Sequence, residues 1–192
     1  MIQVVKDVDI QLFLFLNGMH HPLLDFIMYW ASNRWIWIPF YAFLLWIISK
    51  KSGKTLLPLL IGIAILITFS DQLSVLVFKN HFLRYRPCHN LAIRDLVHLV
   101  VPCGGQYGFV SSHAVNCFAL SAFLTTVYNQ RIPILKFILF PWAILVCYSR
   151  IYNGVHFPAD VLVGAVFGSV LGLLFAQLFL KLSIKYFPSK AF

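Results

Sequence analysis

The stretch from Thr55 to Phe78 constrains this chain most, because it is almost entirely apolar and carries one charged side chain, Asp71. As a helix it would be about 36 Å long, whereas the hydrocarbon core of a bilayer is about 30 Å thick. The sequence therefore predicts a transmembrane helix over about 55–79. Further apolar stretches predict spans at about 35–49, 112–128, 132–149 and 158–183.

The composition agrees with a membrane protein. Charged residues make up 11% of the 192 residues, and hydrophobic residues make up 60%. Soluble domains carry about a quarter charged residues, so an ordinary soluble domain is excluded. We find no repeat and no Gly/Ser-rich linker in the sequence. We expect one all-α membrane domain over 1–192, built as an antiparallel bundle of five or six transmembrane helices.

The N-terminal residues leave the helix number open. An amphipathic segment at about 8–18 and an apolar segment at 22–31 either lie in the interface or form a sixth span, and "ASNR" at 31–34 ends the pattern. The segment before them has a single basic residue, Lys6, and no small-residue cleavage site, so we expect no cleavable signal. A connection of a few residues around Asn129–Arg131 makes the two spans beside it antiparallel neighbours.

The net charge of +9 suggests an anionic partner. Nucleic acid is disfavoured because the basic residues flank apolar spans and form no long basic stripe, which leaves a membrane surface or an anionic substrate. The span count places one basic group on one side and a second group on the other. The first comprises Lys50, Lys51, Lys54, Arg131, Lys181, Lys185 and Lys190; the second comprises Arg34, Lys79, Arg84, Arg86, Arg94 and Arg150.

The two groups contain nearly equal numbers of basic residues, so the positive-inside rule alone does not decide which side is cytoplasmic. If the second group is retained for chemistry, the Lys-rich side is cytoplasmic and the loop at 80–111 faces outward. We therefore expect a multi-pass protein of the cytoplasmic membrane whose site faces the periplasm or the outside.

Three polar segments fall on the same side, at helix ends. They are "KNHFLRYRP" (Lys79 to Pro87), "GFVSSHA" (Gly108 to Ala114) and "SRIYNGVHFPAD" (Ser149 to Asp160). Helices are expected to begin near the last two segments, where free backbone amides favour an anion.

The side chains of these segments suit a phosphate. Lys79, Arg86 and Arg150 supply cations. Ser111 and Ser112 are good helix N-caps whose hydroxyls and amides could also reach an anion. The alternative is that the serines only cap a helix and the arginines anchor lipid headgroups.

His156 and Asp160 form a potential catalytic pair. Pro158 suits a first helical turn, so Asp160 falls in that turn and can reach back towards the imidazole. A carboxylate behind an imidazole fixes its tautomer. No Ser or Cys is well placed in front, so we expect His156, at the rim of the bundle, to attack phosphorus itself. His113 would then protonate the leaving oxygen. A purely structural His–Asp pair is the alternative.

Together the motifs Lys79–x6–Arg86–Pro87, Ser111–x–His113 and Ser149–Arg150–x5–His156–x3–Asp160 resemble the three-part signature of the type 2 phosphatidic acid phosphatase superfamily. The resemblance covers about 55–183 and implies a metal-free enzyme with an antiparallel helical bundle. By this resemblance the roles are those assigned above: phosphate binding by the cations and the Ser111 region, nucleophile His156, orienting partner Asp160 and general acid His113.

The chain departs from the family pattern in the second motif. The usual Pro-Ser-Gly-His reads "VSSH", with Val110 and Ser112 in place of Pro and Gly. Glycine allows the close approach of an anion, so the substitution affects the geometry expected for the phosphate pocket. Ser112 still presents an amide, and we expect catalysis to survive.

Other polar residues carry weaker signals. Asp71 is expected to bridge helices, with a functional role as the alternative, and Arg84 either contacts a headgroup or faces water. The histidines at 20, 21, 81, 89 and 98 lack metal-ligand spacing, so no metal and no cofactor are expected. Cys88 and Cys103 share the outward loop and are expected to form a disulfide; two unpaired thiols are the alternative.

The sequence thus predicts an integral membrane lipid phosphatase that works through a phosphohistidine. Its substrate would be an envelope lipid: a lipid A phosphate, a polyprenyl diphosphate, or a lipid of the phosphatidylglycerophosphate or phosphatidic acid type. No nucleic acid and no obligate protein partner are inferred. The alternative is a lipid-phosphate binding or transport protein without turnover, which would need the cations but not the two histidines.

Overall fold

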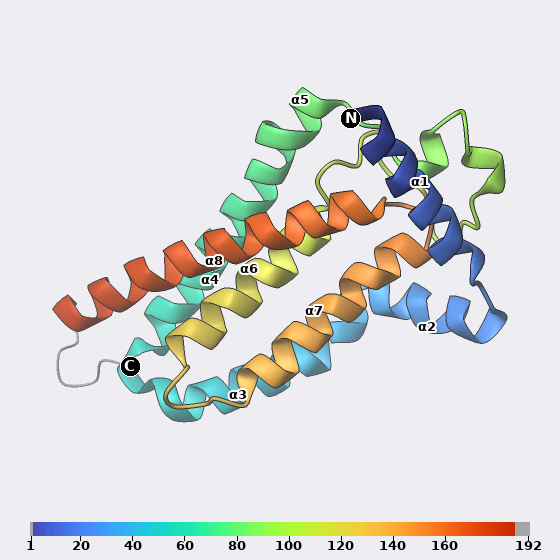
Figure 1. Cartoon of the computed structure of the whole chain (residues 1–192). Coiled ribbons are helices and arrows are strands. Elements are labelled where there is room, and N and C mark those ends of the chain that lie inside the picture. The colour runs from blue at the N-terminus through green and yellow to red at the C-terminus, as the bar shows by residue number, and fades with distance from the viewer. Residues whose placement is uncertain (1, 187–192) are drawn as a thin grey trace.

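The computed structural model describes residues 2–186, and within this part of the chain the regular secondary structure is helical apart from one isolated bridge between Tyr85 and Tyr107 (Figure 1). The α-helices are α1 (Ile2–Gly18), α2 (Pro22–Ser32), α3 (Ile38–Ser52), α4 (Leu56–Leu73), α5 (Asn80–Phe82), α6 (Ser112–Val127), α7 (Leu135–Tyr152) and α8 (Pro158–Tyr186). A π-helical turn, Ser74–Lys79, joins α4 to α5. The all-α prediction is confirmed.

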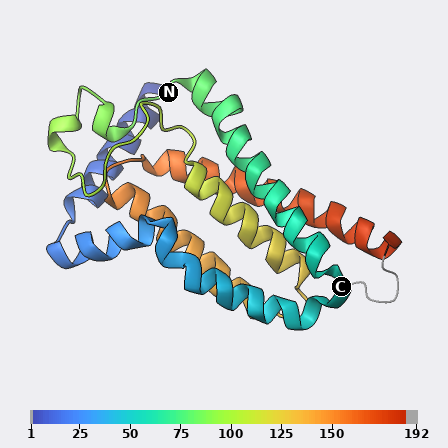
Figure 2. The ribbon, with the colours of Figure 1, turned by 180° about the vertical axis from the view of Figure 1, so that it is seen from behind.

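By length and composition, three helical runs are suited to cross a membrane: Arg34–Phe82, Leu135–Tyr152 and Pro158–Tyr186. The first contains both α3 and α4, which turn back on each other at Gly53, whose φ is 53° (Figure 2). The shorter α6 is also apolar. Each of the five predicted spans is therefore a helix in the bundle.

The helix α6 lies inside the bundle and packs along α8. Glycines spaced four residues apart on α8 make this approach close, because an added Cβ at Gly168 would lie 2.2 Å from the carbonyl oxygen of Val115. At Gly172 it would lie 2.3 Å from the carbonyl oxygen of Ala119. Small residues at such spacing let membrane helices approach backbone to backbone. The pair α6–α8 carries the second and third motifs, so this packing sets their relative position.

We expect Gly168→Ala to lower the melting temperature in detergent, whereas Gly62→Ala leaves it unchanged or raises it. Both changes favour the helix by about 1 kcal/mol. At Gly62 the new methyl group meets side chains at 3.6 Å or more, but at Gly168 it collides with backbone. Overpacking of this kind costs about 1–3 kcal/mol. Equal melting temperatures for the two variants would contradict the close packing.

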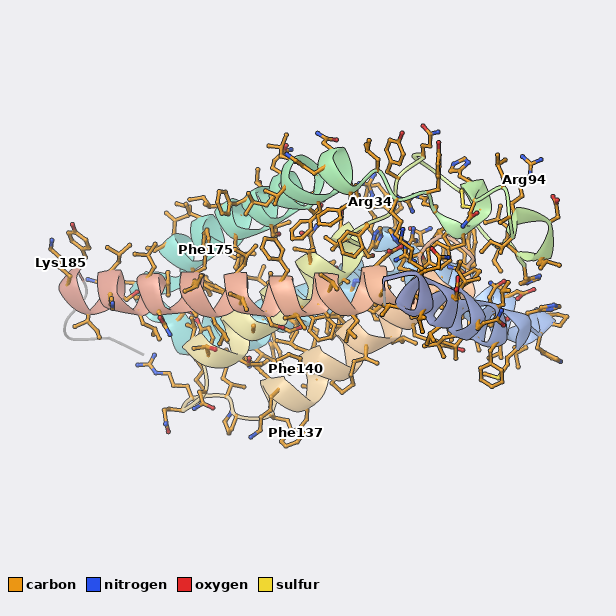
Figure 3. All side chains as sticks on the ribbon, turned by 45° about the horizontal axis from the view of Figure 1, so that its top comes forward. Arg34, Arg94, Phe137, Phe140, Phe175 and Lys185 are labelled. Carbon is orange, nitrogen blue, oxygen red and sulfur yellow. A yellow bond between two sulfur atoms is a disulfide. The ribbon has the colours of Figure 1, made fainter. Side chains whose placement is uncertain are left out.

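The two groups of basic residues lie at opposite ends of the bundle, as predicted. The α3–α4 turn, the α6–α7 connection and the end of α8 lie at the same end of the bundle (Figure 1), and Arg131 Nη1 donates to the Lys51 carbonyl oxygen at 2.8 Å. Figure 3 shows Lys185 at this end and Arg94 at the other. Lys190 lies outside the described residues.

Residues 8–31 do not form one continuous span. They belong to α1 and α2, which are separate helices that lie against the motif-bearing end of α7 and α8 (Figure 1). The inner face of α1 is formed by Asp9, Phe13 and Asn17, one on each successive turn, and these side chains are buried. The α1 helix therefore docks against the same end of the bundle as the three motifs.

Candidate active site

The loop between α5 and α6 is fixed by covalent and backbone links. Cys88 and Cys103 form a disulfide with their Cα atoms 6.1 Å apart, so the predicted pairing is confirmed. The amide of Arg86 donates to the Gln106 carbonyl oxygen at 3.1 Å. The amide of Gly108 donates to the Arg84 carbonyl oxygen at 2.9 Å. These bonds hold the end of the first motif beside the start of the second.

The first motif supplies two cations to the site. Lys79 ends the π-helical turn, and its Nζ donates to Ser112 Oγ at 2.7 Å. Arg86 Nη1 contacts His156 Nε2 at 3.1 Å and donates to the Val155 carbonyl oxygen at 3.2 Å. The first motif thus touches both the second and the third.

The second motif opens α6, which begins at Ser112. Ser111 occupies the N-cap position, as predicted, but its hydroxyl makes no capping hydrogen bond. Instead its amide donates to the Asp160 carbonyl oxygen at 3.0 Å, while its buried Oγ has no hydrogen-bond partner. The hydrogen bond to Asp160 thus fixes the start of α6 against α8, and the Ser111 hydroxyl is left available for a ligand.

The two departures from the family pattern fit locally. Val110 is fully buried and packs in the apolar core. Ser112 Oγ lies between Lys79 Nζ and Ser74 Oγ, each 2.7 Å away. The serine thus holds the lysine of the first motif at the start of α6.

The third motif turns sharply before α8. The amides of Val155 and His156 both donate to the Arg150 carbonyl oxygen at 3.2 Å. Gly154 has a φ of +78°, and an added Cβ there would lie 2.7 Å from Val97 Cγ1, so glycine is required. The turn directs His156 inward, where 1% of the residue is exposed. The expectation that it lies at the rim is therefore wrong, because the α5–α6 loop covers it.

His156 and Asp160 face one another. The imidazole Nδ1 lies 3.5 Å from Asp160 Oδ2, which also accepts a hydrogen bond from the Phe157 amide at 3.0 Å. Arginine has donors only, so Arg86 donates to His156 Nε2. The Nε2 atom then carries a lone pair and the Nδ1 atom carries the proton on the side of the carboxylate.

Electrostatics keep this imidazole neutral. Burial lowers the pKa of His156 well below its usual range, and the positive charges of Arg86, Arg150 and Lys79 lower it further. A cation is disfavoured in a site that is both desolvated and surrounded by positive charge. His156 is thus an imidazole base at neutral pH, with its lone pair directed at the cations.

Several buried polar atoms of this site have no hydrogen-bond partner within residues 2–186. They are Arg86 Nε, Arg150 Nε, Ser111 Oγ and His156 Nδ1. The guanidinium of Arg150 is anchored on its other side, since its Nη1 donates to Ser32 Oγ of α2. Buried polar groups normally find partners, and three of these four atoms are donors in cationic or hydroxyl groups. The arrangement is suited to receive an anion with several oxygens.

A cavity of about 700 Å³ leads from the apolar helices to this site. Ser112 and His113 line one part of it. The remainder is formed largely by apolar side chains of α3, α4, α6 and α7: Leu44, Leu45, Ile48, Leu59, Leu60, Ile63, Ile67, Leu120, Leu124 and Trp142. His113 is the motif histidine that faces this cavity. Asp71, which also lines it, accepts from Asn116 Nδ2 at 3.3 Å and so bridges α4 and α6, in line with its predicted structural role.

The sequence did not indicate the role of Arg84. Its guanidinium is a quarter exposed and forms ion pairs with Asp160 and with Asp9 of α1, at 2.7 Å and 2.5 Å. The available signal was Asp9, which lies one turn before Phe13 in the amphipathic segment and needs a cationic partner if that face is buried. The distance in sequence, about seventy-five residues, concealed that partner.

Comparison with known proteins places this chain in a family. A family model described as the PAP2 superfamily matches residues 55–184. A lipid A 4'-phosphatase of Bacteroides thetaiotaomicron is 37% identical over 188 residues, covering 96% of this chain and 83% of that protein. An undecaprenyl-diphosphatase of Sulfolobus acidocaldarius is 31% identical over 175 residues, covering 88% of this chain and 78% of that protein.

Solved structures agree with this match. LpxE of Aquifex aeolicus superposes with a TM-score of 0.63 at 28% identity, covering 88% of this chain and 94% of its own. A transmembrane PAP2 type phosphatidylglycerolphosphate phosphatase of Bacillus subtilis shares the fold, with a TM-score of 0.67 at 23% identity and coverage of 95% and 88%. The chain therefore belongs to the PAP2 superfamily, as a multi-pass membrane lipid phosphatase.

Proposed function

We propose that the protein removes a phosphate group from lipid A, at the outer face of the cytoplasmic membrane, through a phosphohistidine at His156. The observation that carries the mechanism is the buried imidazole of His156, whose Nε2 lies 3.1 Å from Arg86 Nη1. A nucleophilic lone pair beside cations is the arrangement needed to attack a phosphate. The relative named lipid A 4'-phosphatase covers nearly the whole chain and supports the choice of lipid.

In the first step, the phosphate displaces the contact between Arg86 and His156 and takes the guanidinium as its own partner. Lys79, Arg150 and the Ser111 hydroxyl bind its remaining oxygens. The Nε2 lone pair forms a bond to phosphorus while the bond from phosphorus to the lipid oxygen breaks. The negative charge of the bound phosphate favours a protonated His113, which gives its proton to that oxygen, and Asp160 stabilises the charged ring of His156.

In the second step, water attacks the phosphohistidine. His113, now neutral, takes a proton from the water as the N–P bond breaks. The electrons of that bond return to Nε2, so the imidazole is regenerated and inorganic phosphate leaves. The positive charges that bind the phosphate stabilise the oxygens at which charge develops in both steps.

The cavity supports a lipid substrate. It reaches His113, the residue assigned to the leaving group, and its walls are apolar over α3, α4 and α6. A leaving group that carries hydrocarbon can therefore occupy the membrane-embedded part of the cavity while its phosphate lies among the cations. Such pockets bind apolar ligands by burying most of their surface.

The substrate is tested by incubating the purified protein with labelled lipid A, undecaprenyl diphosphate and phosphatidylglycerophosphate at matched mole fractions in mixed micelles. We expect the highest kcat/KM for lipid A, with release of one phosphate and a product phosphorylated at the remaining position. A clear preference for undecaprenyl diphosphate would replace lipid A as the substrate. The His156→Gln variant controls for contaminating phosphatases.

The orientation of the protein gives a separate prediction. The α3–α4 turn and the end of α8, which carry Lys50, Lys51, Lys54, Lys181 and Lys185, lie at the end opposite the site (Figure 1), and basic residues favour the cytoplasmic side. A reporter fused after Phe192 should register as cytoplasmic, and a single cysteine placed at exposed Leu91 should react with a membrane-impermeant thiol reagent in intact cells. A periplasmic signal from the C-terminal reporter would reverse the orientation.

Turnover is expected to be independent of divalent metal ions, because Lys79, Arg86 and Arg150 neutralise the phosphate. Prolonged treatment with EDTA should leave kcat and KM unchanged. Orthovanadate should inhibit, since it mimics five-coordinate phosphorus. Loss of activity with EDTA that zinc or magnesium restores would contradict this prediction.

A further inference from the structure

Arg84 joins the nucleophile's partner to the N-terminal helix. Its Nη1 donates to Asp160 Oδ1 at 2.7 Å, and its Nη2 donates to Asp9 Oδ2 at 2.5 Å. The guanidinium also lies 4.2 Å from the centre of the Phe157 ring. One planar side chain thus contacts α1, the residue that follows His156, and the carboxylate behind it.

The two carboxylate oxygens of Asp160 make different contacts. Oδ1 accepts from Arg84, while Oδ2 accepts from the Phe157 amide and faces His156 Nδ1. A carboxylate with one oxygen fixed by a charged donor cannot rotate freely. The bond to Arg84 therefore keeps Oδ2 towards the imidazole proton, in the orientation that stabilises the charged ring.

Asp9 in turn holds Arg84. Its Oδ2 accepts from the guanidinium, and its Oδ1 accepts from the Ala159 amide in the first turn of α8, at 2.9 Å. Phe13, one turn along α1, packs edge-on against Phe157 with ring centres 5.3 Å apart. Both carboxylates are almost fully buried, and Arg84 is a quarter exposed. Buried charges require such pairing.

We infer that Arg84, held by Asp9, is a positioning residue for the reaction, which fixes the carboxylate of Asp160 behind His156 and makes α1 part of the active-site framework. This inference rests on the roles proposed above for His156 and Asp160. Arg84 acts through Asp160 and does not touch the phosphate in this arrangement. It differs in this respect from Arg86, which contacts the imidazole directly.

The test compares Arg84→Gln and Asp9→Asn with two matched controls. Arg94 lies in the same loop and pairs only loosely with exposed Asp95, at 3.6 Å. Asp7 lies on the exposed side of α1, where it accepts from Gln3 at 2.9 Å. Arg94→Gln and Asp7→Asn therefore make the same chemical changes away from Asp160.

We expect Arg84→Gln to lower kcat about 10–100-fold, by analogy with the loss seen when the partner that orients a metal ligand is removed. KM should change little, because phosphate binding is left to the other cations. Arg84→Lys should recover part of the loss, since an ammonium can pair with one carboxylate but cannot span both. Asp9→Asn should show a smaller loss, and both controls should match the unmodified protein.

A double-mutant cycle with Asp160→Asn shows whether Arg84 positions the Asp160 carboxylate or only anchors α1 to the bundle. If Arg84 acts through Asp160, adding Arg84→Gln to Asp160→Asn lowers kcat by little more than Asp160→Asn alone. Fully multiplicative losses would overturn the inference, as would an Arg84→Gln variant with the activity of Arg94→Gln. Melting temperatures report any loss of α1 packing separately. A different result would contradict the proposed function itself: turnover of the substrate by the His156→Gln variant.

Discussion

Replacing His156 with Ala should reduce turnover about 10⁶-fold, the scale seen when a catalytic nucleophile is removed. The variant has no imidazole to accept the phosphoryl group, and water alone must attack a phosphate held among cations. The expected loss is the same for lipid A and for para-nitrophenyl phosphate, because the missing atom is required before any leaving group departs.

The buried position of His156 calls for a second variant. Its side chain fills space between Arg86, Gly108 and Asp160, so Ala leaves a void and lowers stability. His156→Gln keeps much of the volume and a hydrogen-bonding group, and it should be equally inactive with a melting temperature close to the unmodified protein. His81→Ala, at an exposed histidine near the same end, should retain full activity. Substantial turnover by His156→Gln would contradict the nucleophile assignment.

Replacing His113 with Ala should produce a loss that depends on the leaving group. A sugar or lipid alcohol cannot depart easily as an anion, so removal of its general acid costs about 10²–10⁴-fold. Para-nitrophenol leaves readily without a proton. The first turnover of para-nitrophenyl phosphate should therefore slow much less than the first turnover of lipid A.

The measurement is made in the pre-steady state with substrate in excess, because His113 also serves the second step, the hydrolysis of the phosphohistidine. Release of para-nitrophenolate reports only the first step, and a normal burst followed by a slow phase is expected for His113→Ala. If His113→Ala slowed the burst and the cleavage of lipid A equally, His113 would not be the general acid. The location of His113 in the cavity, on the side assigned to the leaving group, is the structural reason for the prediction.

Much of the fold follows from short-range patterns. The five spans were predictable because apolar runs long enough to cross a bilayer leave few alternatives, and the first turn of α8 was predictable from Pro158 and Asp160. The glycines of α8, by contrast, do not predict which helix packs against them. That contact, with α6, depends on the packing of the whole bundle.

The site was predictable only in part. Ordered motifs at helix ends indicated that Lys79, Arg86 and His156 belong together, and the structure brings them into one cluster. The burial of His156 was not predictable, because it depends on how the α5–α6 loop closes over the third motif. The link from Arg84 to Asp9 was also missed, since each residue has a plausible solvent-exposed role when considered alone.

The central claim is a covalent phosphohistidine at His156, and rapid quenching tests it most directly. The protein is mixed with substrate, quenched in alkali within one turnover, digested, and mapped by mass spectrometry under conditions that preserve N–P bonds. We predict a phosphoryl group on His156 that is stable in base, is lost in acid, accumulates in His113→Ala with para-nitrophenyl phosphate, and is absent from His156→Gln. A phosphoryl group on another residue, or none at all during a measured burst, would contradict the account.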